Sequence, residues 1–230
     1  MREFFASSMF YGAAVSLLAY ELGLVLKKKF RLAVLNPLLI AVICVIGVNL
    51  VLGVDYQSYN ASGQYLAYLL TPATVCLAVP LYEQLSLLKE NLKAVVCGIL
   101  SGILASLVGV LACAKLFGLD HELYVTLLPK SITTAIGMGV SQELGGIVTI
   151  TVASIIITGI LGNVIADGVF KVFRIQEPVA KGLALGNSAH AIGTARAMEL
   201  GAVEGAMSSL AIAVAGLLTV VGASVFAQFM

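Results

Sequence analysis

Positions 94–114 read AVVCGILSGILASLVGVLACA, an apolar run that Lys93 precedes and Lys115 follows. A helix rises about 1.5 Å per residue, so about 20 apolar residues cross a hydrocarbon core of roughly 30 Å. The run therefore has the length and the composition of one transmembrane helix.

The rest of the chain repeats this pattern. Further runs without charge cover residues 4–20, 32–54, 56–82, 144–166 and 205–230. The chain is 60% hydrophobic and 11% charged, with a mean hydropathy of +1.05, which excludes a soluble domain. We predict an all-α polytopic membrane protein, a helical bundle in one domain over residues 1–230, with roughly six to eight segments that enter the membrane.

Other classes of function lack their usual signals. A net charge of +1 without an extended basic run argues against nucleic-acid binding. Motifs of nucleotide-binding and zinc enzymes, such as GxGxxG and HExxH, are absent, so we expect neither an enzyme nor a cofactor. The cysteines stand singly in apolar runs, which predicts neither a disulfide nor a metal site; they are Cys44, Cys76, Cys97 and Cys113.

Basic residues beside a span tend to stay in the cytoplasm. This rule places the loop with Lys27, Lys28, Lys29 and Arg31 inside and the N-terminus outside. Within residues 56–82, Pro72 and Pro80 predict a broken span that returns to the cytoplasm.

Two later regions are too polar for helices that face lipid. If residues 123–146 crossed the membrane completely, Lys171, Arg174 and Lys181 would lie outside, so a re-entrant hairpin is favoured, with breaks at Pro129 and Gly137. Residues 182–204 form a second re-entrant candidate.

The segments 69–84 and 127–142 both begin Leu-Leu and soon reach a proline. Their likeness is compatible with an inverted repeat, a common feature of secondary transporters.

The first polar region offers groups that bind anions. Lys130 is followed by the hydroxyls of Ser131, Thr133 and Thr134, close to an expected helix start. A helix N-terminus carries positive partial charge, so a carboxylate can bind there. The alternative is structural, with Lys130 reaching the membrane interface and the hydroxyls bonding backbone carbonyls.

The second polar region contains Asn187, Ser188, His190 and Arg196 among small residues. Histidine titrates near neutral pH, so His190 is a candidate for proton coupling, or it bonds a neighbouring helix. Arg196 either clamps a carboxylate or pairs with Glu199 or Glu204.

Asn163 and Asp167 share one face of an expected helix. They line a polar track, bind a cation or cap the helix at the interface.

These regions resemble the LrgB/CidB family of antiholin-like membrane proteins over nearly the whole chain. The resemblance rests on NPLLIA at 36–41, LTPAT at 70–74, AVPLY at 78–82, residues 128–138, and residues 182–196 with EGAMSS at 204–209.

The resemblance implies a multi-pass protein of the bacterial inner membrane with two alternative functions. One is modulation of murein hydrolase activity and cell lysis. The other is carriage of small carboxylates such as pyruvate, glycolate and glycerate, as in a related plastid transporter. It also implies a small LrgA/CidA-like membrane partner.

Buried ionisable groups among helix breakers favour carboxylate transport. We therefore expect a homodimer or a partnered complex with an anion site near the membrane midplane. Lys130, Ser131, Thr133, Thr134, Asn187, Ser188 and Arg196 are the expected substrate contacts, with His190 as the proton carrier.

Overall fold

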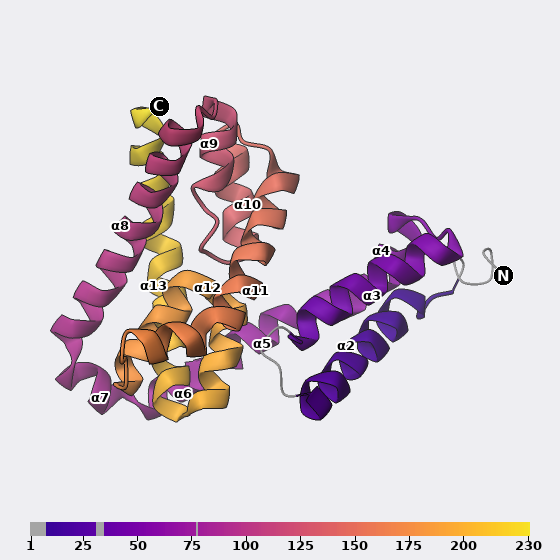
Figure 1. Ribbon diagram of the computed structural model, residues 1–230, viewed down its shortest axis with the longest axis horizontal. Coiled ribbons are helices and arrows are strands. Elements are labelled where there is room, and N and C mark those ends of the chain that lie inside the picture. Colours follow the sequence, from indigo (N-terminus) through magenta and orange to yellow (C-terminus); the bar gives the residue numbers. More distant parts are fainter. Residues whose placement is uncertain (1–7, 31–34, 77) are drawn as a thin grey trace. The chain divides into compact units, whose positions relative to one another are not determined.

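The computed structural model describes residues 8–30, 35–76 and 78–230, which contain helices and no β-strand (Figure 1). These residues confirm the helical membrane architecture. The chain divides into two compact units, Met1–Cys76 and Leu77–Met230, and the single domain over residues 1–230 stays a prediction. Arg31 and residues 1–7, on which the predicted orientation of the N-terminus depends, lie outside the described residues.

The first unit contains four described helices. They are α2 (Tyr11–Phe30), α3 (Pro37–Leu52), α4 (Tyr56–Ala67) and α5 (Leu70–Cys76). α3 begins where it does because Asn36 accepts hydrogen bonds from the N–H groups of Leu38 and Leu39, and because Pro37 suits the first helical position. Gly53 ends α3 in the left-handed conformation, with φ of 65°.

Small and polar residues join α2 to α4. The Gly12 N–H donates to Ser62 Oγ at 2.5 Å, and the hydroxyls of Ser16 and Tyr59 lie 2.7 Å apart. A Cβ on Gly12 would collide with the Tyr59 carbonyl, so the two backbones approach closely only because this residue is glycine.

The described residues of the second unit, 78–230, form nine elements. They are α6 (Ala78–Glu83), α7 (Leu85–Glu90), α8 (Leu92–Phe117), α9 (His121–Leu127), α10 (Thr134–Glu143), α11 (Val148–Val172), α12 (Pro178–Leu200), α13 (Ala202–Phe226) and the 3-10 turn η1 (Ala227–Phe229). Three described helices, α8, α11 and the helix that starts at Ala202, are long and apolar enough to cross a membrane. They account for the runs 94–114, 144–166 and 205–230.

The runs nearer the N-terminus give shorter helices. Residues 32–54 yield only the 16 residues of α3. Residues 56–82 are divided among α4, α5 and α6. Pro72 and Pro80 lie in the first turns of α5 and α6, where the missing N–H removes no helical hydrogen bond.

A regular apolar stripe joins α8 to α13. Val95, Ile99, Ile103 and Leu107 recur every four residues and are buried, so they form one face of α8. They belong to one core cluster with small or flexible residues of α13, namely Met207, Ala211 and Ala215. Close packing of small residues is the usual means of joining helices in lipid.

α9 and α10 form a re-entrant hairpin, here called hairpin A (residues 121–143). It starts beside the C-terminal end of α13, where the Tyr124 hydroxyl donates to the Phe226 carbonyl at 2.8 Å. The chain turns at residues 128–133 and returns, so that the N–H of Ile147 donates to Thr126 Oγ1 at 2.8 Å. Hairpin A therefore enters and leaves at the same end of the unit, as the positive charges predict.

A cluster of buried hydroxyls joins hairpin A to α11. The Thr151 hydroxyl donates to the Thr126 carbonyl at 2.8 Å and lies 2.7 Å from the Ser141 hydroxyl. Thr126, Ser141 and Thr151 are all fully buried. Since lipid supplies no hydrogen bonds, these groups must satisfy one another.

We expect Thr151→Val to lower the free energy of unfolding by about 1–2 kcal/mol, because it leaves two buried polar groups without this partner. Thr158→Val is the matched control on the same helix, since its hydroxyl makes no hydrogen bond to any described residue. Thermal unfolding in detergent measures both. Equal losses in the two variants would contradict a role for the cluster.

α12 is a second re-entrant hairpin, here called hairpin B (residues 178–200). The backbone folds sharply at His190, where φ is 41° and ψ is −132°. A Cβ on Gly193 would collide with the Leu185 carbonyl, although these residues would lie about 12 Å apart in a continuous helix. The two arms therefore run back along each other.

The two hairpins approach from opposite ends of the unit and meet near its middle. Figure 1 shows α9 and α10 in the upper half and α12 in the lower half. Both reach Ile155 of α11, which is fully buried: a Cβ on Gly137 would touch its side chain, and His190 bonds its carbonyl. Halves of broken helices that meet at midplane are the arrangement in which many transporters bind their substrates.

The contacts of α8 and α13 also show the level at which hairpins A and B meet. On α13, Ser208 bonds Thr194 of hairpin B, whereas Gly216 packs against Ile136 of hairpin A. On α8, residues 98–102 contact hairpin B and residue 106 contacts hairpin A. On each helix, the boundary between the contacts with hairpin B and those with hairpin A lies near the centre.

Candidate functional site

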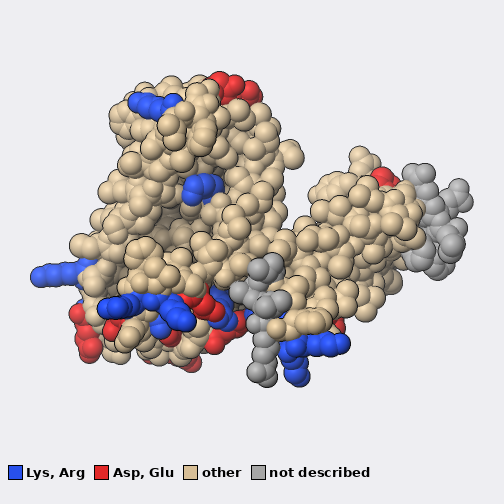
Figure 2. Space-filling view, viewed as in Figure 1, with Lys and Arg blue, Asp and Glu red and all other residues tan. Residues whose placement is uncertain are grey.

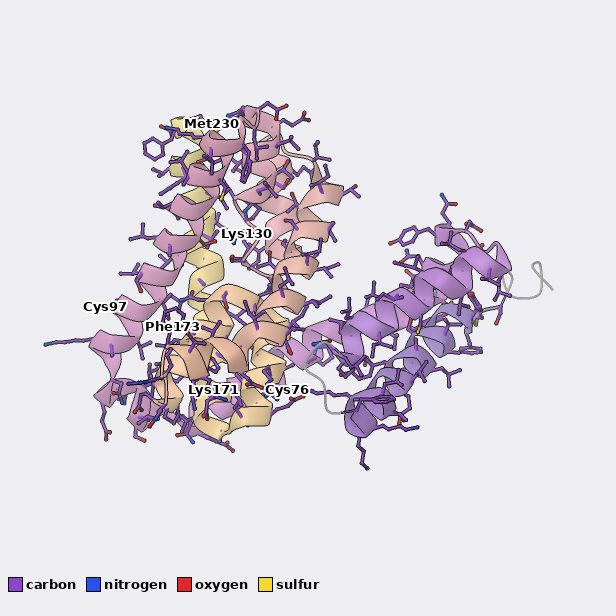
Figure 3. The ribbon with its side chains drawn as sticks, in the orientation of Figure 1. Cys76, Cys97, Lys130, Lys171, Phe173 and Met230 are labelled. Atoms are coloured by element: carbon purple, nitrogen blue, oxygen red, sulfur yellow. The ribbon has the colours of Figure 1, made fainter. Side chains whose placement is uncertain are left out.

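Lys130 lies at the tip of hairpin A. Its ammonium donates to Ser131 Oγ at 3.1 Å and to Ser106 Oγ of α8 at 3.5 Å, and the two hydroxyls lie 2.9 Å apart. Figure 2 shows a basic side chain in the hollow of the uncharged face, and Figure 3 labels Lys130 at this height of the unit. None of the described carboxylates forms an ion pair with it. The charge of this partly buried cation is therefore uncompensated.

The local sequence explains the tip. Pro129 follows Leu128, the C-cap residue of α9, and disfavours continued helix. Two turn hydrogen bonds then close the bend: Lys130 N–H to the Leu127 carbonyl and Ile132 N–H to the Pro129 carbonyl. Thr133 is extended and is the N-cap residue of α10. The prediction of a break at Pro129 agrees with this geometry.

Gly137 does not break the chain, so that expectation is wrong. It lies inside α10 and makes a regular hydrogen bond to the Thr133 carbonyl. Its lack of a side chain serves packing, because a Cβ there would collide with Ile155 Cδ1.

Thr133 and Thr134 lie at the N-terminus of α10, close to Lys130 in sequence. The Thr133 side chain makes no capping hydrogen bond, and both side chains are half-buried. Their hydroxyls have no hydrogen-bond partner within the described part of the chain, so they remain available to a ligand. The N–H groups of the first turn of α10 add positive partial charge.

Asn187 lies on the first arm of hairpin B. Its amide Nδ2 donates to the carbonyls of Gly98 and Ile99 on α8, both at 3.3 Å. Its Oδ1 is buried without a partner among residues 8–30, 35–76 and 78–230. Ser188 faces away: it is exposed and donates to the Ala184 carbonyl of its own helix at 2.7 Å.

We expect Gly102→Ala to lower the free energy of unfolding by about 1–3 kcal/mol, because the new methyl would overpack the contact with Asn187. A Cβ there would lie 2.5 Å from Asn187 Nδ2. Gly109→Ala is the matched control on α8, since a Cβ at Gly109 meets nothing within 4 Å. Thermal unfolding of both variants measures the difference, and similar losses would exclude the contact as the cause.

His190 occupies the fold of hairpin B. Its positive φ is rare for a residue with a side chain and costs about 1–3 kcal/mol. The ring is 4% exposed, and Nε2 lies 2.9 Å from the Ile155 carbonyl; since a carbonyl only accepts, Nε2 carries the proton. The interhelical hydrogen bond that the sequence left open is thus present, and proton coupling stays a prediction.

Arg196 does not join Lys130 in one site. Its guanidinium pairs with Asp167 of α11 at 2.6 Å and with Glu199 at 2.7 Å, the second being one of the alternatives from the sequence. Asp167 lies twelve residues beyond Ile155 on α11, about 18 Å along the helix axis. The expectation that Arg196 helps to bind the substrate is therefore not supported by its position, because two carboxylates already occupy it.

Asn163 and Asp167 have a shared role that the sequence did not suggest. Asn163 Nδ2 donates to the Ile192 carbonyl at 3.2 Å, and Asp167 accepts from Arg196. Both partners belong to the second arm of hairpin B. One face of α11 therefore holds this arm in place.

Sequence reasoning missed Ser106 and Ile155. Ser106 is one of two serines in the run 94–114 and has no motif around it. Ile155 takes part through its backbone carbonyl, which no sequence pattern reveals.

Comparisons with known proteins agree with this description. The model of the LrgB-like family matches residues 16–229. Holin-like protein CidB of Staphylococcus epidermidis is 40% identical over 196 residues, 85% of this chain and 86% of that protein. Antiholin-like protein LrgB of Bacillus mycoides is 37% identical over 227 residues, 97% of this chain and 99% of that protein. No solved structure matches. The chain is a membrane protein and belongs to the LrgB-like family.

Proposed function

We propose that the protein carries small carboxylate anions across the membrane and binds them at the tip of hairpin A. The observation that carries this proposal is Lys130, a partly buried cation near the middle of the bundle, whose ammonium bonds only hydroxyls among the described residues. A charge inside the membrane is costly and is usually kept for function.

The surroundings of Lys130 suit a small monoanion. One ammonium balances one carboxylate, and the N-terminus of α10 adds partial positive charge. Ser106, Ser131, Thr133 and Thr134 supply hydroxyls that replace the water lost on entry. Pyruvate, glycolate and glycerate belong to this class.

The paired hairpins suit a carrier that opens to each side in turn. Hairpin A comes from one end of the unit and hairpin B from the other, so movement of either one would expose the tip to a different side. Asn187 lines hairpin B near this level, and His190 lies at its fold, where a coupled proton would travel.

The distribution of cations favours an orientation in a bacterial inner membrane. Most basic residues of the second unit lie where α8 begins and α11 ends, and we place that end in the cytoplasm. They are Lys89, Lys93, Lys171, Arg174, Lys181 and Arg196, against Lys115 at the opposite end. The same proposal places the N-terminus outside the cytoplasm, and it includes a homodimer and a small LrgA/CidA-like partner.

A second candidate is modulation of murein hydrolase activity and cell lysis. The names of the relatives, holin-like and antiholin-like, support it directly, and they do not mention transport. In this function the hairpins would serve assembly with a holin-like partner, and the charge of Lys130 would matter more than its geometry.

Ligand-induced stabilisation of the purified protein separates the two candidates. A carboxylate present at a hundred times its dissociation constant should stabilise the protein by about 2.7 kcal/mol, and chloride at equal ionic strength should not. A different result would favour the second candidate: no carboxylate stabilises the protein, and cells that lack the protein show an altered rate of lysis and altered murein hydrolase activity.

A further inference from the structure

An open pocket lies at the end of the second unit where α11 stops. It has a volume of about 330 Å³, and its lining includes Lys171, Arg174, Lys181 and a single carboxylate, Asp167. Asp167 is already paired with Arg196, and none of the three cations forms an ion pair with a described carboxylate. The pocket therefore keeps a net positive charge.

Apolar residues adjoin these cations. Phe170, Ile175 and Leu200 complete the lining, while Val172 and Phe173 are 75% and 72% exposed at the end of α11. Figure 3 labels Lys171 and Phe173, and Figure 2 shows charged side chains gathered at the lower end of this unit. Since α11 is long enough to span the membrane, its last turn would reach the lipid headgroups.

The backbone of Arg174 gives an independent indication. Arg174 has φ of 55° just after the helix end, and the N–H of the next residue, Ile175, donates to the Phe170 carbonyl. Glycine usually occupies such a left-handed position at the end of a helix. A strained residue suggests that the side chain is needed. An arginine matches a phosphate with two parallel hydrogen bonds.

We propose that this pocket binds the phosphate of an anionic phospholipid headgroup, with Lys171, Arg174 and Lys181 around the phosphate and with Val172 and Phe173 at the boundary between the headgroups and the acyl chains. Because Lys181 and Leu200 lie at the two ends of hairpin B, a bound lipid would join the base of hairpin B to α11. The site is distinct from Lys130 and does not depend on transport.

The test compares the unfolding temperature of the purified protein in a neutral detergent with four additives: dioctanoyl phosphatidylglycerol, dioctanoyl phosphatidylcholine, inorganic phosphate and glycerol phosphate. Phosphatidylglycerol should raise it saturably, and the other three should not. Lys171→Gln should raise the half-saturating concentration about fivefold. Lys115→Gln, a matched change at the exposed far end of α8, should leave it unchanged.

Arg174→Gly separates binding from folding. It should raise the unfolding temperature without lipid, because it relieves the positive φ, and it should weaken the effect of phosphatidylglycerol at the same time. Equal effects of the two lipids, or of Lys171→Gln and Lys115→Gln, would overturn the proposal. Inorganic or glycerol phosphate as effective as phosphatidylglycerol would overturn the assignment to a lipid.

Discussion

Replacement of Lys130 by methionine should reduce carboxylate uptake into proteoliposomes about a hundredfold, since loss of one partner of a buried charge pair costs about 2–5 kcal/mol. Methionine is unbranched and apolar and only one atom shorter than lysine, so hairpin A should still fold. The protein should even gain stability, because an uncompensated cation is removed from its interior. Uptake and thermal unfolding of the same preparation measure both effects.

Lys130→Arg distinguishes a binding site from a simple positive charge. The hydrogen-bond distances from Lys130 Nζ to the hydroxyls of Ser131 and Ser106 fit a compact ammonium. The wider guanidinium of arginine should therefore impair uptake nearly as strongly as methionine. Lys115→Met removes an exposed lysine of α8 and should leave uptake unchanged. Full uptake by Lys130→Arg would show that any positive charge suffices at this position and would contradict a site of fixed geometry.

Replacement of His190 by valine should destabilise the protein by at least about 3 kcal/mol, because a β-branched residue is poorly tolerated at positive φ and the bond to Ile155 is lost. His190→Gly should stay within about 1 kcal/mol of wild type, since relief of strain offsets the lost hydrogen bond. Thermal unfolding ranks the variants, and a valine variant as stable as the glycine variant would contradict the fold at His190.

The glycine variant also tests proton coupling, because it retains the fold without the imidazole. If His190 carries the proton, uptake by His190→Gly should continue but should no longer respond to a proton gradient. Uptake with unchanged gradient dependence would leave His190 a structural role, as the residue that bends hairpin B.

The broad architecture could be predicted from sequence because lipid imposes simple rules. Runs of apolar residues identified α8, α11 and α13, and the positions of Lys171, Arg174 and Lys181 favoured a hairpin A that returns to its own side. Proline chemistry located the tip at Pro129. These signals are local or depend on charge alone.

Which of the predicted residues lie together in the candidate site depends on helix packing, and the sequence does not reveal that packing. Arg196 and Lys130 looked equivalent as intramembrane cations, yet only Arg196 has acidic neighbours once α11 lies beside hairpin B. His190 gave no warning of a sharp bend, since few residues other than glycine adopt positive φ. Gly137 looked like a breaker, although its small size serves contact with Ile155.

Uptake by the wild-type protein is the most direct test of the central claim, which is that the hairpins meet around a carboxylate site. Purified protein in proteoliposomes would receive labelled pyruvate, glycolate or glycerate, with and without the small LrgA/CidA-like partner and a proton gradient. The account predicts saturable uptake of at least one of them that unlabelled carboxylate inhibits. Absent or non-saturable flux, even with the partner, would contradict it.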